Sequence, residues 1–92
     1  MTEVTIRIPT PLRGFVGGVD QVTVPASTVG EALAALTAGR DSLRARLFTD
    51  DGELRRFVNV YLGREDVRRI GGLEAALPSG ATLTLMVALA GG

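Results

Sequence analysis

Both ends of this 92-residue chain alternate apolar with polar residues, and that pattern constrains the fold more than any other feature. Val4, Ile6 and Ile8 repeat with period two near the N-terminus, and a second alternation runs from Leu83 to Leu89. Period two is typical of a β-strand with one buried face. Two strands with strong apolar faces can lie side by side at the centre of one sheet if another element covers them both.

One amphipathic helix between these strands can supply that cover. Val29, Leu33 and Leu36 stand at positions i, i+4 and i+7, so they form one apolar stripe. Thr28 and Glu31 predict a capping box, in which the Thr28 hydroxyl accepts a hydrogen bond from the Glu31 N–H. In return, we expect the Glu31 carboxylate to accept one from the Thr28 N–H. The helix should therefore begin after Thr28.

Shorter patterns account for the rest of the chain. The glycine-rich residues 13–18 predict the loop of a wide hairpin, and Gly39 predicts a left-handed residue where the main helix ends. Four further elements are expected: a strand at 21–24, a short helix around 43–47, a strand at 57–62 and a helical turn at 73–77. This order predicts a single α+β domain over residues 1–92, with a mixed sheet and one main helix packed on one face.

Composition excludes several classes of function. The chain has no cysteine and no histidine, so a disulfide, a thiolate nucleophile and the commonest metal ligand are all absent. Its formal net charge is zero, which does not favour binding to nucleic acid. No stretch approaches the ~20 apolar residues of a membrane span, and the N-terminus lacks the pattern of a signal peptide. We therefore expect a cytoplasmic protein.

All ten basic residues are arginine, and they include two adjacent pairs. These are Arg55 with Arg56 and Arg68 with Arg69. A solvated face explains such pairs more often than a docking site does, so the sequence alone gives them no function.

The chain ends in Gly91 and Gly92, directly after the last predicted strand. Glycine has no Cβ and adopts strained conformations easily, so two glycines allow a close approach to the backbone. We expect a free, flexible Gly-Gly tail over residues 88–92, which would span ~16 Å when extended. The alternative is a frayed end without function.

Several segments together identify a resemblance that covers residues 4–92. They are Ile8-Pro9-Thr10, Leu12-Arg13, Gly17-Gly18, RFVNVY at 56–61, EDVR at 65–68, Gly71-Gly72-Leu73 and Ala90-Gly91-Gly92. The chain resembles the ubiquitin-like sulfur carriers of the MoaD/ThiS family, and within it the CysO type, which serves cysteine biosynthesis. The resemblance implies the β-grasp fold.

The resemblance also implies a function for Gly92, with Gly91 beside it. An E1-like enzyme would use ATP to adenylate the Gly92 carboxylate, and a sulfur donor would convert the adenylate to a thiocarboxylate. The sulfur would pass to an acceptor enzyme that resembles a cysteine synthase or the large subunit of molybdopterin synthase. The carrier would bind no cofactor and would not itself be an enzyme.

Other functions remain open at this point. Within the same mechanism, the sulfur could serve molybdopterin or thiamine thiazole synthesis. In a second class, a ubiquitin-like protein modifier, the activated Gly92 would be joined to a lysine of another protein. In a third, the domain would be an interaction module with an inert tail.

The face of the sheet opposite the helix is the expected docking surface for partner enzymes. We expect six residues on it or near the chain end to contact partners: Phe57, Asn59, Tyr61, Met86, Leu89 and Ala90. Contiguous exposed apolar side chains are unusual on monomers, which favours such a surface. The alternative is that Phe57 or Tyr61 packs as a satellite of the core.

Overall fold

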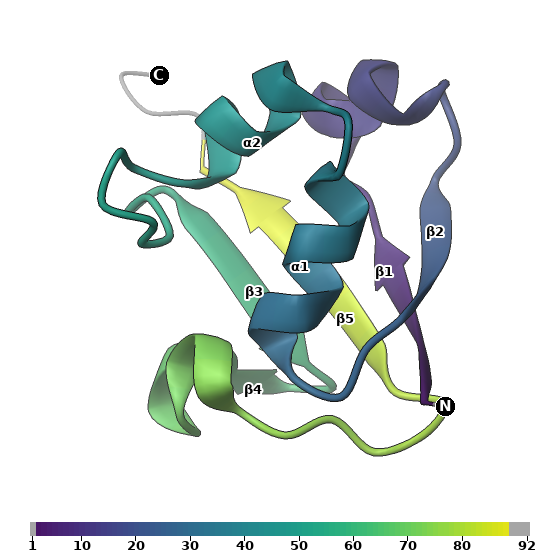
Figure 1. Ribbon diagram of the computed structural model, residues 1–92, viewed down its shortest axis with the longest axis vertical. Helices are drawn as coiled ribbons and strands as arrows, with labels where there is room; N and C mark the ends of the chain where they lie inside the picture. The colour runs from purple at the N-terminus through teal and green to yellow at the C-terminus, as the bar shows by residue number, and fades with distance from the viewer. Residues whose placement is uncertain (1, 89–92) are drawn as a thin grey trace.

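Residues 2–88, the part of the chain that the computed structural model describes, contain one five-stranded mixed sheet (Figure 1). Its strands are β1 (Glu3–Arg7), β2 (Gln21–Pro25), β3 (Val58–Leu62), β4 (Glu65–Asp66) and β5 (Thr82–Val87). Their order across the sheet is β2-β1-β5-β3-β4. β1 and β5 pair in parallel, and the other neighbours pair antiparallel.

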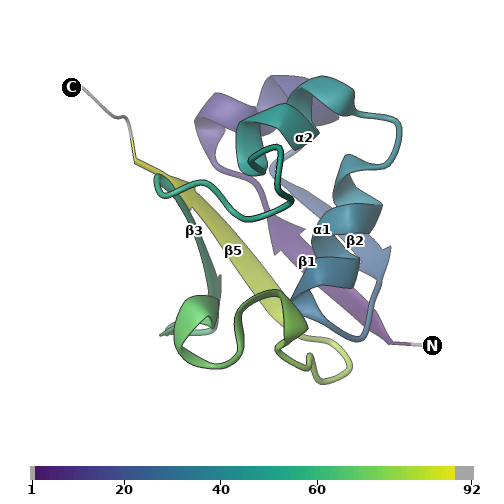
Figure 2. The ribbon, with the colours of Figure 1, turned by 60° about the vertical axis from the view of Figure 1, so that its left-hand side comes forward.

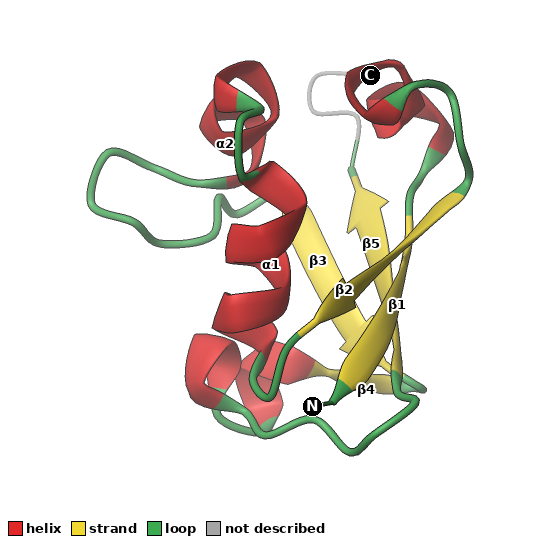
Figure 3. Cartoon of the chain, turned by 45° about the vertical axis from the view of Figure 1, so that its right-hand side comes forward, coloured by secondary structure: helices red, strands yellow, loops and turns green. Residues whose placement is uncertain are grey.

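The first and last strands are therefore neighbours at the centre of the sheet, which confirms the arrangement predicted from the two alternating patterns. Ile6 of β1 stands opposite Leu83 of β5. Helix α1 (Val29–Thr37) crosses one face of this pair, while no α-helix of residues 2–88 covers the other face (Figure 3). A hairpin, a crossing helix and a parallel return strand at the centre make up the β-grasp fold.

Helix α1 begins and ends where the sequence predicted. The Thr28 hydroxyl accepts a hydrogen bond from the Glu31 N–H at 3.1 Å, as expected of a capping residue. The return bond differs, because the Glu31 carboxylate accepts from the Ser27 N–H at 2.7 Å and not from Thr28. An antiparallel bridge between Thr28 and Ala76 keeps this segment extended. Gly39 has a φ of +71° in the turn that follows the helix.

The core lies between α1 and the covered face of the sheet. Val29, Leu33 and Leu36 of the predicted apolar stripe are fully buried, and they belong to one cluster with Ile6 and Leu83. Burying each such side chain contributes about 1.5–3 kcal/mol, so this cluster accounts for most of the favourable free energy of folding.

The predicted hairpin loop at residues 13–18 is wrong in part, because a 3-10 helix spans Thr10–Val16. Leu12 and Val16 are buried on one side of this helix, which packs against α2 (Asp41–Leu47). Pro11 stands in the first turn, where its missing N–H costs no hydrogen bond. The turn back to β2 follows at Gly17, with a φ of +75°.

The short helix expected around 43–47 is confirmed as α2, whose Leu43 and Leu47 are buried. The helical turn expected at 73–77 is a 3-10 helix at Gly72–Glu74, and a further 3-10 helix at Val67–Arg69 had not been predicted. Neither α-helix of residues 2–88 has the length and apolar character that crossing a bilayer would require.

Candidate functional site

Strand β5 leads directly to the end of the chain. Its last residue, Val87, pairs with Val58 of β3, at the end of the sheet far from the start of β1 (Figure 2). The next residue, Ala88, donates its N–H to the Phe57 carbonyl oxygen at 2.8 Å. Hydrogen bonding to the β3 side thus continues one residue beyond β5, and Ala88 is the last described residue.

Four of the predicted site residues lie outside the described residues. They are Leu89, Ala90, Gly91 and Gly92. The structure therefore tests neither their roles nor the predicted tail over residues 88–92, and these stay predictions.

The open face of the sheet carries three of the other predicted docking residues: Asn59, Tyr61 and Met86. Strand register places Tyr61 opposite Thr84, and Asn59 opposite Met86. The Met86 side chain is 52% exposed, whereas Asn59 and Tyr61 are half-buried. The open face thus presents one exposed apolar side chain, Met86, in a largely polar row close to the chain end.

Phe57 precedes β3 and is half-buried. It packs against the apolar core cluster, so the satellite-core alternative describes it better than full exposure does. Its carbonyl holds Ala88, so this residue supports the start of the chain end through its backbone as well as through its side chain. Contact between Phe57 and a partner stays a prediction.

Asn59 is held by an arginine that the sequence analysis had not placed in the site. The Arg68 guanidinium donates from Nη1 to the Asn59 Oδ1 at 3.1 Å and from Nη2 to the Arg55 carbonyl oxygen at 2.9 Å. Arg55 and Arg68, one from each adjacent pair, are therefore in contact near the start of β3. The pairs were visible in the sequence, but their closeness in space was not, because 13 positions separate Arg55 from Arg68.

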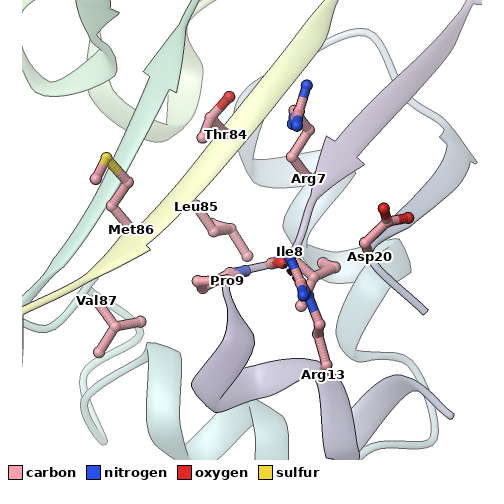
Figure 4. Close-up of a pocket in the computed structure, with 9 residues that line it drawn as sticks. All are labelled: Arg7, Ile8, Pro9, Arg13, Asp20, Thr84, Leu85, Met86 and Val87. Carbon is pink, nitrogen blue, oxygen red and sulfur yellow. Dashed lines mark hydrogen bonds between the residues drawn. The ribbon is translucent and has the colours of Figure 1, made fainter. Parts of the chain in front are cut away.

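A shallow groove of about 270 Å³ lies beside the last half of β5 (Figure 4). Pro9, Leu85 and Val87 give it an apolar floor, while Arg7 and Arg13 add two guanidinium groups. The Arg13 side chain is fixed, because its Nε donates to the Ile8 carbonyl oxygen at 3.0 Å. The Asp20 carboxylate also lines the groove, so its charged groups include both signs. Sequence reasoning had noted Arg13 only as part of a motif.

Groups that could do chemistry on their own are scarce in this region. Residues 2–88 contain no cluster of three or more His, Cys, Asp or Glu side chains that could hold a metal ion. The buried side-chain nitrogen and oxygen atoms of the same residues all have hydrogen-bond partners, so none is left over to bind a ligand in the interior. The Thr37 hydroxyl, for example, donates to the Leu33 carbonyl at 2.8 Å.

Comparison with known proteins gives three close similarities. The sulfur carrier protein CysO of Mycobacterium tuberculosis is 41% identical over 92 residues, which cover 98% of this chain and 99% of that protein. The crystal structure of the BexX/CysO complex of Amycolatopsis orientalis matches with a TM-score of 0.86 and 44% identity, over 97% of this chain and 99% of that one. Small archaeal modifier protein 1 of Haloferax volcanii matches with a TM-score of 0.78 and 31% identity, over 92% of this chain and 95% of that one.

A family model covers nearly the whole chain as well. The model of the ThiS family matches residues 6–92, a range that runs from the second buried residue of β1 through the terminal glycines. The family match, the near full-length identity to CysO and the shared β-grasp architecture agree with one another. This chain is a member of the ThiS family.

Proposed function

We propose that this chain is a sulfur carrier whose reactive group is the carboxylate of Gly92, and that its sulfur serves cysteine biosynthesis. The observation that carries the proposal is the 41% identity to the sulfur carrier CysO over 98% of the chain. The ThiS family match, which includes Gly91 and Gly92, supports it.

The proposed chemistry has three steps, all carried out by partner enzymes. First, a carboxylate oxygen of Gly92 attacks the α-phosphorus of ATP, and pyrophosphate leaves. Sulfide (HS⁻) then attacks the acyl carbon of the adenylate, AMP leaves, and a thiocarboxylate results. Finally, the thiocarboxylate sulfur displaces the leaving group of a free serine substrate activated at its hydroxyl, and water cleaves the resulting acyl bond, which frees cysteine and returns the Gly92 carboxylate. The carrier would contribute its acyl group and its docking surface, and would not itself be an enzyme.

The position of Ala88 in the sheet supports these separate roles for the carrier and its partner enzymes. Ala88 is hydrogen-bonded at the rim of the sheet, and the four residues that follow can span at most ~14 Å. The enzyme that activates Gly92 must therefore approach the folded domain closely. We propose that it contacts the open face through Met86, Asn59 and Tyr61, with Leu89 and Ala90 beside its reaction site.

The identity of the partners rests on the relatives. A CysO protein with the same fold has been crystallised in a complex with BexX, so a domain of this kind can dock on another protein. We propose an E1-like adenylating enzyme and a sulfur-acceptor enzyme resembling a cysteine synthase as the two partners of this chain, with ATP bound by the first of them.

Intact mass spectrometry of the protein purified from its own host tests the proposal. A thiocarboxylate raises the mass by the difference between sulfur and oxygen, and a cysteinyl adduct would identify the acceptor pathway. As a matched control, deletion of Gly92 should abolish the mass increase while leaving the melting temperature unchanged. If only the carboxylate form is found, and host extract with ATP and a sulfide donor leaves the mass unchanged, the proposal is wrong.

One second candidate has an observation of its own. The 31% identity to a small archaeal modifier protein favours conjugation of Gly92 to lysines of other proteins. The two functions differ in product, since conjugation leaves higher-mass isopeptide-linked species and sulfur transfer releases a small thiol compound. Molybdopterin or thiazole synthesis would share the thiocarboxylate but not the cysteinyl adduct.

A further inference from the structure

We infer that Arg68 is a positioning residue for the chain end, because its guanidinium fixes the turn that holds Ala88. The inference rests on the proposed function of Gly92 only for its effect on activity. Its structural part stands on hydrogen bonds within residues 2–88.

The turn at residues 55–58 is the element through which Arg68 would act. It is closed by a hydrogen bond from the Val58 N–H to the Arg55 carbonyl oxygen at 3.0 Å. Within the turn, the Phe57 carbonyl accepts the N–H of Ala88 at 2.8 Å. Together with the pairing of Val87 and Val58 in the sheet, this turn therefore holds Ala88, from which residues 89–92 continue.

Two groups of contacts hold the turn against the domain. On the α2 side, Arg55 donates its backbone N–H to the Leu47 carbonyl and its Nε to the Ala45 carbonyl, each at 2.9 Å. From the 3-10 helix Val67–Arg69, Arg68 donates from Nη2 to the Arg55 carbonyl, which thus accepts two hydrogen bonds. Arg68 is the only side chain from outside the turn that donates to it within residues 2–88.

Arg68 itself is well placed to act as a fixed point. Val67 beside it is fully buried, and the Arg68 backbone N–H donates to the Asp66 carboxylate at 2.9 Å. Its Nη1 bond to the Asn59 Oδ1 orients the planar guanidinium along β3. The guanidinium reaches the Asn59 Oδ1 and the Arg55 carbonyl with two separate nitrogens in one rigid plane, whereas a lysine ammonium must place all its donors on a single nitrogen.

The chain provides a matched control in the neighbouring arginine. Arg69 lies in the same 3-10 helix, carries the same charge and is also exposed. Within residues 2–88 its guanidinium makes no hydrogen bond to Asn59 or to the 55–58 turn. Arg69→Ala therefore removes one positive charge and leaves both hydrogen bonds of the Arg68 guanidinium in place.

The structural test is amide hydrogen exchange at Ala88, followed by NMR in the full-length protein. We expect Arg68→Ala and Arg68→Lys to speed exchange at Ala88 about fivefold, the factor expected for losing one ordinary hydrogen bond. Exchange in β1 and α1 should stay unchanged, and Arg69→Ala should behave as wild type. Unchanged exchange at Ala88 in Arg68→Ala, or restoration by Arg68→Lys, would overturn the inference.

The functional test is the steady-state rate of ATP-dependent activation by the host's adenylating enzyme. A displaced chain end should lower kcat severalfold, and any rise in KM should not exceed that of Asn59→Ala, which removes the Asn59 amide from the docking surface and leaves the Arg68 bond to the Arg55 carbonyl in place. A rise in KM alone would show that Arg68 contacts the partner instead, and would overturn the positioning role. If even the wild-type protein is not activated, the proposed function fails, and the exchange experiment still decides whether Arg68 positions Ala88.

Discussion

Two alanine substitutions on the predicted docking surface should have different effects: one should lower stability, and the other should weaken partner binding. Met86 and Phe57 were both predicted to contact partners. The structure leaves Met86 52% exposed and packs Phe57 against the core. Met86→Ala should therefore affect binding, and Phe57→Ala should affect mainly folding.

The expected loss of stability follows from burial. A fully buried Phe→Ala change costs 3–5 kcal/mol, so the half-buried Phe57 should cost about 2 kcal/mol. For a domain of this size, that lowers the melting temperature by roughly 8–16 °C. Met86 is 52% exposed and does not belong to the core cluster, so Met86→Ala should cost about 1 kcal/mol and lower the melting temperature by about 4–8 °C.

The expected loss of binding follows from the exposed part of Met86. If the partner enzyme covers that surface, the side chain contributes about 1 kcal/mol to the complex, which corresponds to an approximately fivefold change in affinity. Met86→Ala should therefore raise KM for ATP-dependent activation about fivefold and leave kcat unchanged.

Thermal unfolding by circular dichroism and activation kinetics check the two effects separately. Ile70→Ala is the matched control, because Ile70 is 40% exposed and lies outside β3 and β5. It should leave KM unchanged and lower the melting temperature about as much as Met86→Ala does, because the two side chains are similarly exposed. The reasoning is refuted if Met86→Ala unfolds the protein like a core mutant, or if its KM equals that of the control.

Three further substitutions test the fold. Leu36→Ala removes a fully buried side chain, so urea denaturation should show a loss of about 3 kcal/mol, and a loss below about 1 kcal/mol would contradict the single core. Thr28→Ala removes the cap of α1 and should cost about 1 kcal/mol in the same assay, whereas Thr28→Ser should restore most of it. Gly71→Ala forces a residue with a Cβ to a φ of +124° and should cost about 1–3 kcal/mol, so a neutral result would show that this backbone relaxes.

The main elements of the fold were predictable because each left a periodic pattern in the sequence. The stripe of α1 repeats every three to four residues, and the central strands alternate with period two. Once these elements are assigned, only a few arrangements bury both strand faces under one helix, and the β-grasp is one of them. The central pairing of β1 with β5 followed from this argument and was confirmed.

The elements that were missed are too short for periodicity to reveal. β4 has two residues, and the 3-10 helix Val67–Arg69 has three. The longer 3-10 helix Thr10–Val16 was predicted as a loop in part, because Pro9, Pro11 and Gly14 are residues typical of loops. The spacing of its buried Leu12 and Val16, four residues apart, does not match the three-residue period of such a helix, so periodicity gave no signal for it.

The candidate site was predictable only where it follows the chain. Met86 and Asn59 lie on the open face because alternation along a strand assigns faces directly. The hydrogen bonds of the Arg68 guanidinium and the groove beside Arg13 are formed by segments that are distant in the sequence and come into contact only in the folded chain. A single sequence does not indicate which of its distant segments come into contact.

The central position of β5 affects when the protein can fold during its synthesis on the ribosome. A strand at an edge could join late, but the strand between β1 and β3 must be present before the two halves of the sheet can unite. This domain therefore stays without its tertiary structure until β5 has left the exit tunnel, and such long-range pairing slows folding. A chain cut short by premature termination lacks the middle of its sheet and should be removed by proteases.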